Sequence, residues 1–279
     1  MDETFSSIDL ATTCLLDSER TETFGKVIHE LVKPGHIVLD VGTGPGIMAL
    51  FAARAGAKKV YAIESNPYTA KIATQNIENN NFKDIISVFL ADARNINFKE
   101  GMFFDVVIME MLTTGMVDEY QVWAVNNLFS KGYVNEKTIF VPYRHDTFIT
   151  PMETNFVNYG FYMRMVKHVW NFLPKQDMRS LADKSELHSI SFNKNNNINS
   201  KTDKIFEIKE DGVLNSIYLE SETWLNKTVR LGDTLALNAP VIYPLFKDVQ
   251  VKKGDKVRLK MKYMFGNGYR NLETYMVKL

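Results

Sequence analysis

The sequence predicts an α/β protein in which a mostly parallel, helix-covered sheet is followed by a mainly antiparallel, β-rich part. Up to about residue 143, apolar strand-like runs alternate with helical patterns, as crossover connections between parallel strands require. From residue 144 onward, short β-like runs are separated by turn residues. The charge divides in the same region, because residues 1–150 carry 13 Lys/Arg and 19 Asp/Glu whereas residues 151–279 carry 20 and 14. We therefore expect two domains, residues 1–143 and 144–279.

The composition indicates a globular protein with a sizeable core. The chain has 279 residues, of which 45% are hydrophobic and 24% are charged, far from the balance of a disordered sequence. Its net charge of zero argues against a protein built to coat a polyanion. The amino terminus is acidic and polar, unlike a secretory signal, and apolar runs such as residues 47–53 are far too short to span a membrane. We expect a soluble, cytoplasmic protein with no membrane partner.

The elements of the first half follow from local patterns. Asp17 or Ser18 can cap a helix that runs through residues 24–33 until Pro34 and Gly35 end it. Residues 37–41 are apolar except for Asp40, which is typical of a strand covered on both faces. The elements expected after these are a helix at 47–54, a strand at 60–63, a helix from Pro67, strands at 86–90 and 104–109, a helix at about 118–129 and a strand at 138–141.

The second half is predicted to be mainly antiparallel. Short strands are expected at residues 145–150, 190–192, 204–208, 216–220, 228–231, 241–246 and 256–265. Residues 155–169 are the plausible helix of this half, and the Asn-rich residues 193–199 indicate an exposed loop. Apolar and cationic side chains alternate over residues 256–263. This alternation favours a solvated outer face over a nucleic-acid-binding patch, since lysines on strands also discourage edge aggregation.

A glycine-rich turn follows the strand at 37–41. Glycines at 42, 44 and 46 let the backbone turn sharply and let a ligand lie against the main chain. The spacing matches neither a dinucleotide fingerprint nor a phosphate-binding P-loop. Glu64 ends the next strand, where a carboxylate can accept hydrogen bonds from both ribose hydroxyls, and Asp92 ends the third, where it can accept from the amine of an adenine. Ligands bind open α/β sheets at such carboxyl ends.

Residues 38–64 resemble the first motif of class I S-adenosylmethionine-dependent methyltransferases and are similar in detail to the protein arginine methyltransferases. Residues 15–21 resemble that family's leading helix, in which an arginine, here Arg20, binds the cofactor's carboxylate. Residues 140–153 resemble the passage from the sheet domain into a β-barrel. The resemblance implies a Rossmann-like domain followed by a β-barrel-like domain, with S-adenosyl-L-methionine as cofactor and S-adenosyl-L-homocysteine as product. The cofactor-binding residues implied are Arg20, Asp40, Gly42, Thr43, Gly44, Gly46, Glu64, Ser65, Asp92, Ala93 and Glu110.

Two acids in the loop after the fourth strand extend the resemblance. The arginine methyltransferases carry two glutamates nine positions apart there, and Glu110 and Glu119 have this spacing. The resemblance implies that both are catalytic, because opposing carboxylates can hold a planar guanidinium by charge-assisted hydrogen bonds. The methyl transfer then depends on positioning and electrostatics. Alternatively, Glu119 with Asp118 stabilises the first turn of a helix, and Glu110 contacts only the cofactor.

Two departures from the family leave the methyl acceptor open. Residues 113–115 differ from the family's aromatic-rich loop, and residues 237–240, Leu-Asn-Ala-Pro, stand where the family has a Thr-His-Trp loop. We expect an enzyme that methylates a nitrogen nucleophile, a guanidino or amino group of a protein, a peptide or a small molecule. The alternatives are a small-molecule N- or O-methyltransferase, an RNA methyltransferase and a non-catalytic S-adenosylmethionine-binding subunit. Nucleic acid is the less expected acceptor, because the chain lacks the Pro-Pro-aromatic run with which base-amino methylases stack a flipped base.

The sequence also supports expectations about metal binding, the single cysteine and dimerisation. No metal site is expected, since the five histidines do not pair with Cys or acids at ligand spacing. Cys14, the single cysteine, is expected to be a small buried hydrophobe. Residues 160–170 fall where the family has a dimerisation arm, so a homodimer is possible, although an ordinary core helix explains their apolar residues equally well.

Overall fold

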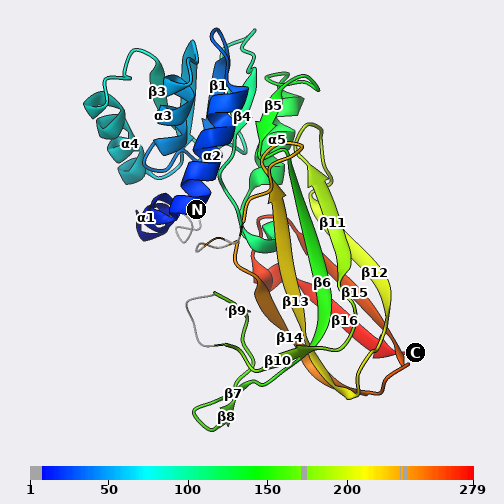
Figure 1. Ribbon diagram of the computed structural model, residues 1–279. Coiled ribbons are helices and arrows are strands. Elements are labelled where there is room, and N and C mark those ends of the chain that lie inside the picture. The colour runs from blue at the N-terminus through cyan, green and yellow to red at the C-terminus, as the bar shows by residue number, and fades with distance from the viewer. Residues whose placement is uncertain (1–7, 171–174, 233, 235–237) are drawn as a thin grey trace.

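A parallel sheet with its helices forms one end of the molecule, and antiparallel strands extend away from it (Figure 1). The computed structural model describes residues 8–170, 175–232, 234 and 238–279. Residues 1–7, in which the sequence predicts no secretory signal, lie outside these ranges. In the described part of the chain, no helix is long and apolar enough to cross a membrane.

The parallel sheet has the strand order β3-β2-β1-β4-β5. Its strands are β1 (Ile37–Val41), β2 (Lys59–Glu64), β3 (Ile86–Leu90), β4 (Val106–Ile108) and β5 (Ile139–Val141). The helices are α1 (Ile8–Leu16), α2 (Ser18–Leu31), α3 (Ile47–Arg54), α4 (Pro67–Asn79) and α5 (Gln121–Ser130). The strand order places β1 at the centre, so that the ends of β1, β2 and β4 meet at one edge.

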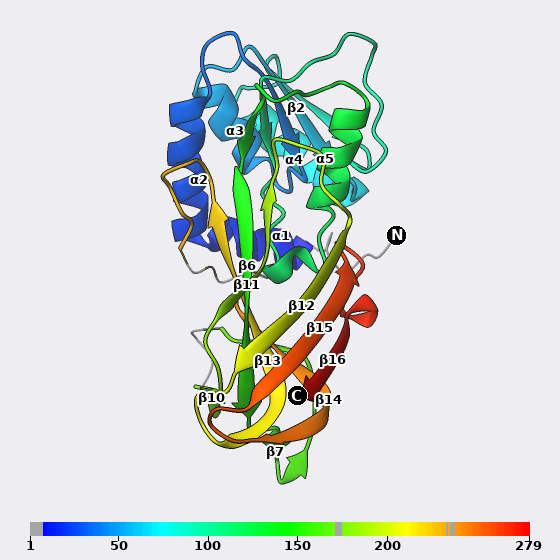
Figure 2. The same cartoon turned by 90° about the vertical axis from the view of Figure 1, so that its right-hand side faces the viewer.

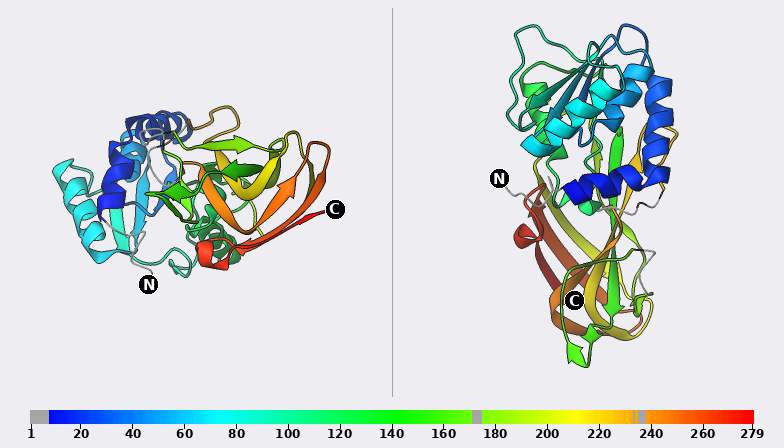
Figure 3. Two further views of the ribbon diagram at one scale, coloured as in Figure 1. Left: turned by 90° about the horizontal axis from the view of Figure 1, so that it is seen from below. Right: turned by 90° about the vertical axis from the view of Figure 1, so that its left-hand side faces the viewer.

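Local signals explain most of these elements. Asp17 caps α2 by accepting a hydrogen bond from the Arg20 backbone N–H at 3.2 Å, as the sequence predicts. Asn66 caps α4, and Pro67 occupies its first turn. Two details differ from expectation. The separate helix α1 precedes α2 and lies across the junction between the two ends of the molecule (Figure 3), and α5 begins at Gln121 rather than at Asp118.

The antiparallel part consists mainly of two sheets. One has the order β10-β6-β13-β14-β9, with β11 also paired to β6, and the other, β12-β15-β16, runs obliquely across it (Figure 2). The strands are β6 (Arg144–Thr154), β9 (Lys167–His168), β10 (Met178–Ser180), β11 (Ser185–Ser191), β12 (Asn199–Glu207), β13 (Gly212–Trp224), β14 (Val241–Val251), β15 (Lys256–Met264) and β16 (Glu273–Lys278). The α/β class with a parallel and then an antiparallel part is confirmed.

The helix expected at residues 155–169 is wrong. Its first half forms a two-stranded hairpin, β7 (Val157–Asn158) with β8 (Phe161–Tyr162), and its end forms β9. Tyr159 and Gly160 both have positive φ, which produces the tight turn that the apolar spacing concealed. The strand expected at residues 228–231 is also wrong, since the described residues there make only an isolated bridge between Trp224 and Arg230.

The alternating stretch at residues 256–263 is confirmed as a strand with a solvated outer face. Val257 and Leu259 are fully buried, and β15 lies in the middle of its sheet. On the outer face, Arg258 pairs with Asp203 at 2.7 Å and Lys262 pairs with Glu273 at 2.8 Å. Acids on the two neighbouring strands therefore partly neutralise this face.

Two apolar clusters cover the parallel sheet. On one face, α2 and α3 pack through side chains such as Phe24, Ile28 and Ala49. The cluster on the other face includes residues of α5 and continues through Met116 and Val117 into the antiparallel strands. Because dense cores transmit displacements, the segment between β4 and α5 is coupled to both parts of the molecule.

Candidate functional site

The glycine turn at the end of β1 lines a cavity of about 490 Å³. Gly42, Gly44 and Gly46 have φ of 70°, 54° and 96°, values that favour glycine. The backbone N–H groups of Gly42 and Thr43 both donate to the Ile63 carbonyl, at 3.0 and 2.9 Å, which ties the turn to β2. Three predicted residues, Gly42, Thr43 and Gly44, lie on the cavity wall.

Asp40 and Gly46 support the turn from behind the wall. Asp40 is 1% exposed and accepts a hydrogen bond from the Thr43 hydroxyl at 2.6 Å. Burial raises the pKa of Asp40 to about 7, against the effect of this hydrogen bond. Gly46 is the N-cap residue immediately before α3. Neither residue is among those that line the cavity, and their predicted role in cofactor binding stays a prediction.

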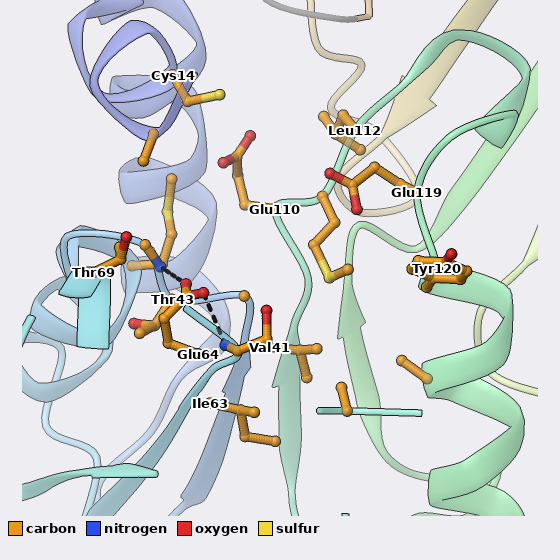
Figure 4. Close-up of a pocket in the computed structure, with 18 of the residues that line it drawn as sticks. Cys14, Val41, Thr43, Ile63, Glu64, Thr69, Glu110, Leu112, Glu119 and Tyr120 are labelled. Atoms are coloured by element: carbon orange, nitrogen blue, oxygen red, sulfur yellow. Dashed lines mark hydrogen bonds between the residues drawn. The ribbon is translucent and has the colours of Figure 1, made fainter. Parts of the chain in front are cut away.

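Glu64 and Ser65, at the end of β2, also line the cavity (Figure 4). The Glu64 carboxylate accepts from the backbone N–H groups of Gly44 at 3.0 Å, Ser65 at 2.8 Å and Asn66 at 2.9 Å. These bonds fix its orientation and hold the glycine turn. A carboxylate has about four acceptor sites, so one hydroxyl group can still donate to it.

Asp92 and Ala93, after β3, line the cavity as predicted, but Asp92 is engaged by a neighbour. Its carboxylate accepts from Arg94 Nε at 3.0 and 2.9 Å and from Nη2 at 2.5 Å. Burial alone would raise the pKa of Asp92, but the hydrogen bonds and charge of Arg94 lower it. The Arg94 guanidinium in turn lies 4.1 Å from the ring centroid of Tyr120. Arg94 and Tyr120, which the sequence analysis missed, also line the cavity.

Arg20 and Glu110 form a buried ion pair inside the cavity. Arg20 is 2% exposed, and its Nε and Nη2 groups contact Glu110 Oε1. Burial would lower the pKa of Arg20, but the Glu110 carboxylate raises it, so the guanidinium stays charged. Burial raises the pKa of Glu110, and Arg20 opposes that rise. Arg20 Nη1 is buried without a hydrogen-bond partner among the described residues, so it has a donor to offer to a ligand.

Two further acids, Asp118 and Glu119, also line the cavity. Glu119 stands in the loop before α5, across from Glu110 (Figure 4). Burial first, and then the charges of Glu110 and Asp118, raise the pKa of Glu119 to about 8. Since α5 begins at Gln121, Glu119 is outside its first turn, which weakens the helix-stabilising interpretation.

The antiparallel part completes the cavity with the β15–β16 loop. Gly266, Asn267, Gly268 and Arg270 line the wall there, and the sequence analysis missed all four. The sequence indicates residues 237–240 as the place of the family's Thr-His-Trp loop. Leu237 lies outside the described residues, and the Ala239 carbonyl accepts a hydrogen bond from Thr114 Oγ1 at 2.6 Å. The Gly-Asn-Gly sequence between two alternating strands was the available signal, since it indicates a tight turn.

Cys14 and the histidines add no nucleophile or metal site. Cys14 lines the cavity, and burial raises the pKa of its thiol to about 12, which keeps it protonated. Over the part of the chain that is described, no three His, Cys, Asp or Glu side chains are grouped closely enough to hold a metal ion.

Several known methyltransferases are similar to this chain in sequence. The family model of ribosomal protein L11 methyltransferase (PrmA) matches residues 19–135. The uncharacterized protein MJ1452 of Methanocaldococcus jannaschii is 32% identical over 267 residues, which cover 95% of this chain and 94% of that protein. Protein arginine N-methyltransferase 6 of Danio rerio is 29% identical over 54% of this chain, but the match spans only 42% of the zebrafish protein.

Among solved structures, the Trypanosoma brucei PRMT1 enzyme–prozyme heterotetrameric complex with AdoHcy is similar along its whole length. The TM-score is 0.74, with 16% sequence identity over 99% of both chains. At that identity the likeness concerns the fold, and it extends over the parallel sheet and the antiparallel strands together.

Proposed function

We propose that this chain, a class I S-adenosylmethionine-dependent methyltransferase of the same family as MJ1452, transfers a methyl group to the nitrogen of a cationic, guanidinium-type acceptor. The observation that carries the proposal is that Glu110, Asp118 and Glu119 line the same cavity as the glycine turn, with Glu119 across from Glu110. The charges of Asp118 and of Glu110, which is paired with Arg20, help to raise the pKa of Glu119, and a cation bound beside these acids opposes that effect.

The cavity fits S-adenosylmethionine on several grounds. Arg20 Nη1 is a buried donor without a partner among the described residues, and it suits the cofactor's carboxylate. Glu64 retains acceptor capacity for one ribose hydroxyl, and the glycine turn leaves room for a ligand against the backbone. The Asp92 carboxylate, which is paired with Arg94, can also accept a hydrogen bond from the adenine amine. The Tyr120 ring provides a second contact for the Arg94 guanidinium. When bound, the cofactor supplies an electrophilic methyl group on a sulfonium.

The protein's own contribution is to hold and orient the acceptor. Glu119 and Glu110 can accept hydrogen bonds from different nitrogens of one guanidinium, which fixes its plane. A guanidinium beside Glu119 lowers the pKa of that carboxyl from about 8, so binding favours its ionised form. The pairing concentrates positive charge on the held nitrogens and leaves electron density on the third, the nucleophile.

An acceptor panel tests the proposal. We expect methyl transfer from labelled S-adenosylmethionine to an arginine-glycine peptide, and at least about tenfold slower transfer to the same peptide with lysine, because an ammonium cannot bridge two carboxylates in a plane. Product mass and label position are the readouts. Transfer to lysine alone, to a neutral small molecule or to RNA contradicts the guanidinium proposal and leaves the methyltransferase assignment standing.

RNA is the less supported acceptor. The main reason to consider RNA as the acceptor was the cationic face of β15. On that face, Arg258 is paired with Asp203 and Lys262 with Glu273. Paired charges release fewer counterions on binding a polyanion, so they contribute less to affinity.

The proposal extends to assembly, because the β7–β8 hairpin projects from the far end of the molecule (Figure 1) and exposes apolar side chains. These are Val157, Tyr159, Phe161, Tyr162, Met163 and Met165. Such a projecting apolar patch is typical of an interface, and the structurally similar trypanosomal protein occurs in a heterotetrameric complex. We expect this chain to form a homodimer through the hairpin.

Sedimentation equilibrium measures the assembly. The expected result is a dimer near 64 kDa, twice the 32.0 kDa chain mass, that becomes a monomer in the Phe161→Ser/Tyr159→Ser variant. Phe246→Ser, which changes an exposed aromatic outside the hairpin, serves as the control and should remain dimeric. A monomeric wild-type protein at micromolar concentration contradicts the assembly proposal.

A further inference from the structure

The segment that joins Glu110 to Glu119 is fixed to the antiparallel strands by hydrogen bonds. The Gly115 N–H donates to Ser221 Oγ at 2.9 Å, and the Gly115 carbonyl accepts from the Tyr263 hydroxyl at 2.8 Å. On either side, Thr114 Oγ1 donates to the Ala239 carbonyl, and the Met116 carbonyl accepts from the Gly266 N–H. Both faces of the Gly115 residue are therefore held by strands that lie more than 100 positions further along the chain.

The hydrogen-bond directions in this network are determined by its members. The Gly115 carbonyl can only accept, so the single hydroxyl hydrogen of Tyr263 must point to it. His188 Nε2 lies 2.6 Å from the same hydroxyl oxygen and must donate to it. Burial lowers the pKa of His188 to about 3, so the ring is neutral with its hydrogen on Nε2. Burial also raises the pKa of Tyr263, which keeps its hydroxyl protonated.

We call the hydrogen bonds that hold residues 114–116 to the antiparallel part the clamp. A glycine is favoured at position 115 of the clamp for a steric reason. Its φ of 69° favours glycine, and a Cβ atom there would come within 3.3 Å of Val117 Cγ2 and 3.4 Å of the Tyr263 hydroxyl. Tyr263 itself is 3% exposed and Met116 is fully buried, so the segment has little room to shift. Thr114 and Gly115, two of the residues that differ from the family's loop, take part in these hydrogen bonds.

We propose that Tyr263, oriented by His188, is a positioning residue that sets the relative placement of Glu110 and Glu119 through the Gly115 carbonyl. This inference rests on the proposed function, because it assigns the two glutamates to the acceptor. Its physical basis is that each glutamate lies within five residues of Gly115, whose N–H and carbonyl are both held by the antiparallel strands. A shift of about 1 Å in a positioning group can lower a rate by about a hundredfold.

Tyr263→Phe removes only the hydroxyl, and Tyr133→Phe is its matched control. Tyr133 is also buried, and its hydroxyl also donates to a backbone carbonyl, that of Phe98, at 3.1 Å. Both variants lose a buried hydrogen bond, so a purely structural role predicts similar losses of stability. Only Tyr263 contacts the segment between the two glutamates.

Two readouts test the inference. In Tyr263→Phe we expect the titration midpoint of Glu119, followed by its carboxyl carbon-13 signal, to fall by at least one pH unit toward the ordinary value. With the arginine-glycine peptide, kcat should fall at least about tenfold while the dissociation constant for S-adenosylhomocysteine stays within about twofold. Tyr133→Phe should change none of these three quantities beyond twofold or a few tenths of a pH unit.

Two variants of His188 test whether its N–H donor orients the Tyr263 hydroxyl. His188→Gln keeps an N–H donor for the Tyr263 hydroxyl and should retain most of kcat and the Glu119 midpoint, whereas His188→Leu should behave like Tyr263→Phe. If the Glu119 midpoint in Tyr263→Phe equals that of the wild type, the positioning role is wrong. If the wild type leaves the arginine peptide unmethylated, the proposed function fails, and the Glu119 titration still decides the positioning role by itself.

Discussion

Glu119→Gln is expected to lower methyl transfer to a guanidinium acceptor by about one to two orders of magnitude while leaving the dissociation constant for S-adenosylhomocysteine within about twofold. Hydrogen bonds to charged groups contribute about 1.5–3 kcal/mol each, and about 1.4 kcal/mol corresponds to a factor of ten in rate. The amide keeps the shape of the carboxylate and loses its charge and one acceptor. Because Glu119 lies across the cavity from the glycine turn, the cofactor's contacts are spared.

The measurements are kcat with the arginine-glycine peptide and calorimetric titration with S-adenosylhomocysteine. Glu100→Gln, the same chemical change at an exposed position, is the control and should match the wild type in both. A fully active Glu119→Gln enzyme would show that this carboxylate does not hold the acceptor.

The raised pKa of Glu119 adds a pH signature to this prediction. Because the ionised form holds the acceptor and the pKa is about 8, kcat/KM of the wild type should rise about tenfold per pH unit below 8 and level off above it. The stability linkage has the opposite direction. The folded state binds a proton that the unfolded state releases near pH 4.5, so this stabilising contribution is complete below 4.5 and is lost as the pH rises through about 8. The gap in Tm between Glu119→Gln and the wild type should therefore widen in favour of the variant from pH 5 to 9.

Arg20→Met is expected to destabilise the protein by about 3–5 kcal/mol, because it leaves the Glu110 carboxylate buried without its partner. The double variant Arg20→Met/Glu110→Gln should lose clearly less stability than the sum of the two single changes, since neither charge then remains unpaired. Urea unfolding at pH 7 measures the four free energies. The cofactor should also bind at least about tenfold more weakly to both Arg20 variants, because the donor at Nη1 is gone.

The control for this cycle lies on the same helix. Lys26 pairs with Glu22 at 4.0 Å, and both side chains are more than two-thirds exposed, so Lys26→Met should change the free energy of unfolding by less than about 0.5 kcal/mol. Additive losses in the Arg20 and Glu110 variants would show that the two charges do not stabilise each other.

A feature could be predicted from the sequence when it depends on residues that are close together along the chain. The helix at 155–169 was wrong because apolar spacing fits a helix and a projecting hairpin equally, and only the positive φ of Tyr159 and Gly160 distinguishes them. The sequence did not predict Arg94 as a residue of the site, for a different reason. Two residues from Asp92, it looks like a surface cation, and its position over Tyr120 requires the packing of α5 against the sheet.

The sequence by itself determined that β1, β2 and β3 are parallel strands joined by crossover helices, and it determined the glycine turn and the acids at the strand ends, because these features follow from neighbouring residues. Only the tertiary structure decided which of these groups meet. Arg20 pairs with Glu110 across 90 positions, and Tyr263 reaches Gly115 across 148. Contacts at such separations arise from the packing of whole elements, and no local pattern encodes them.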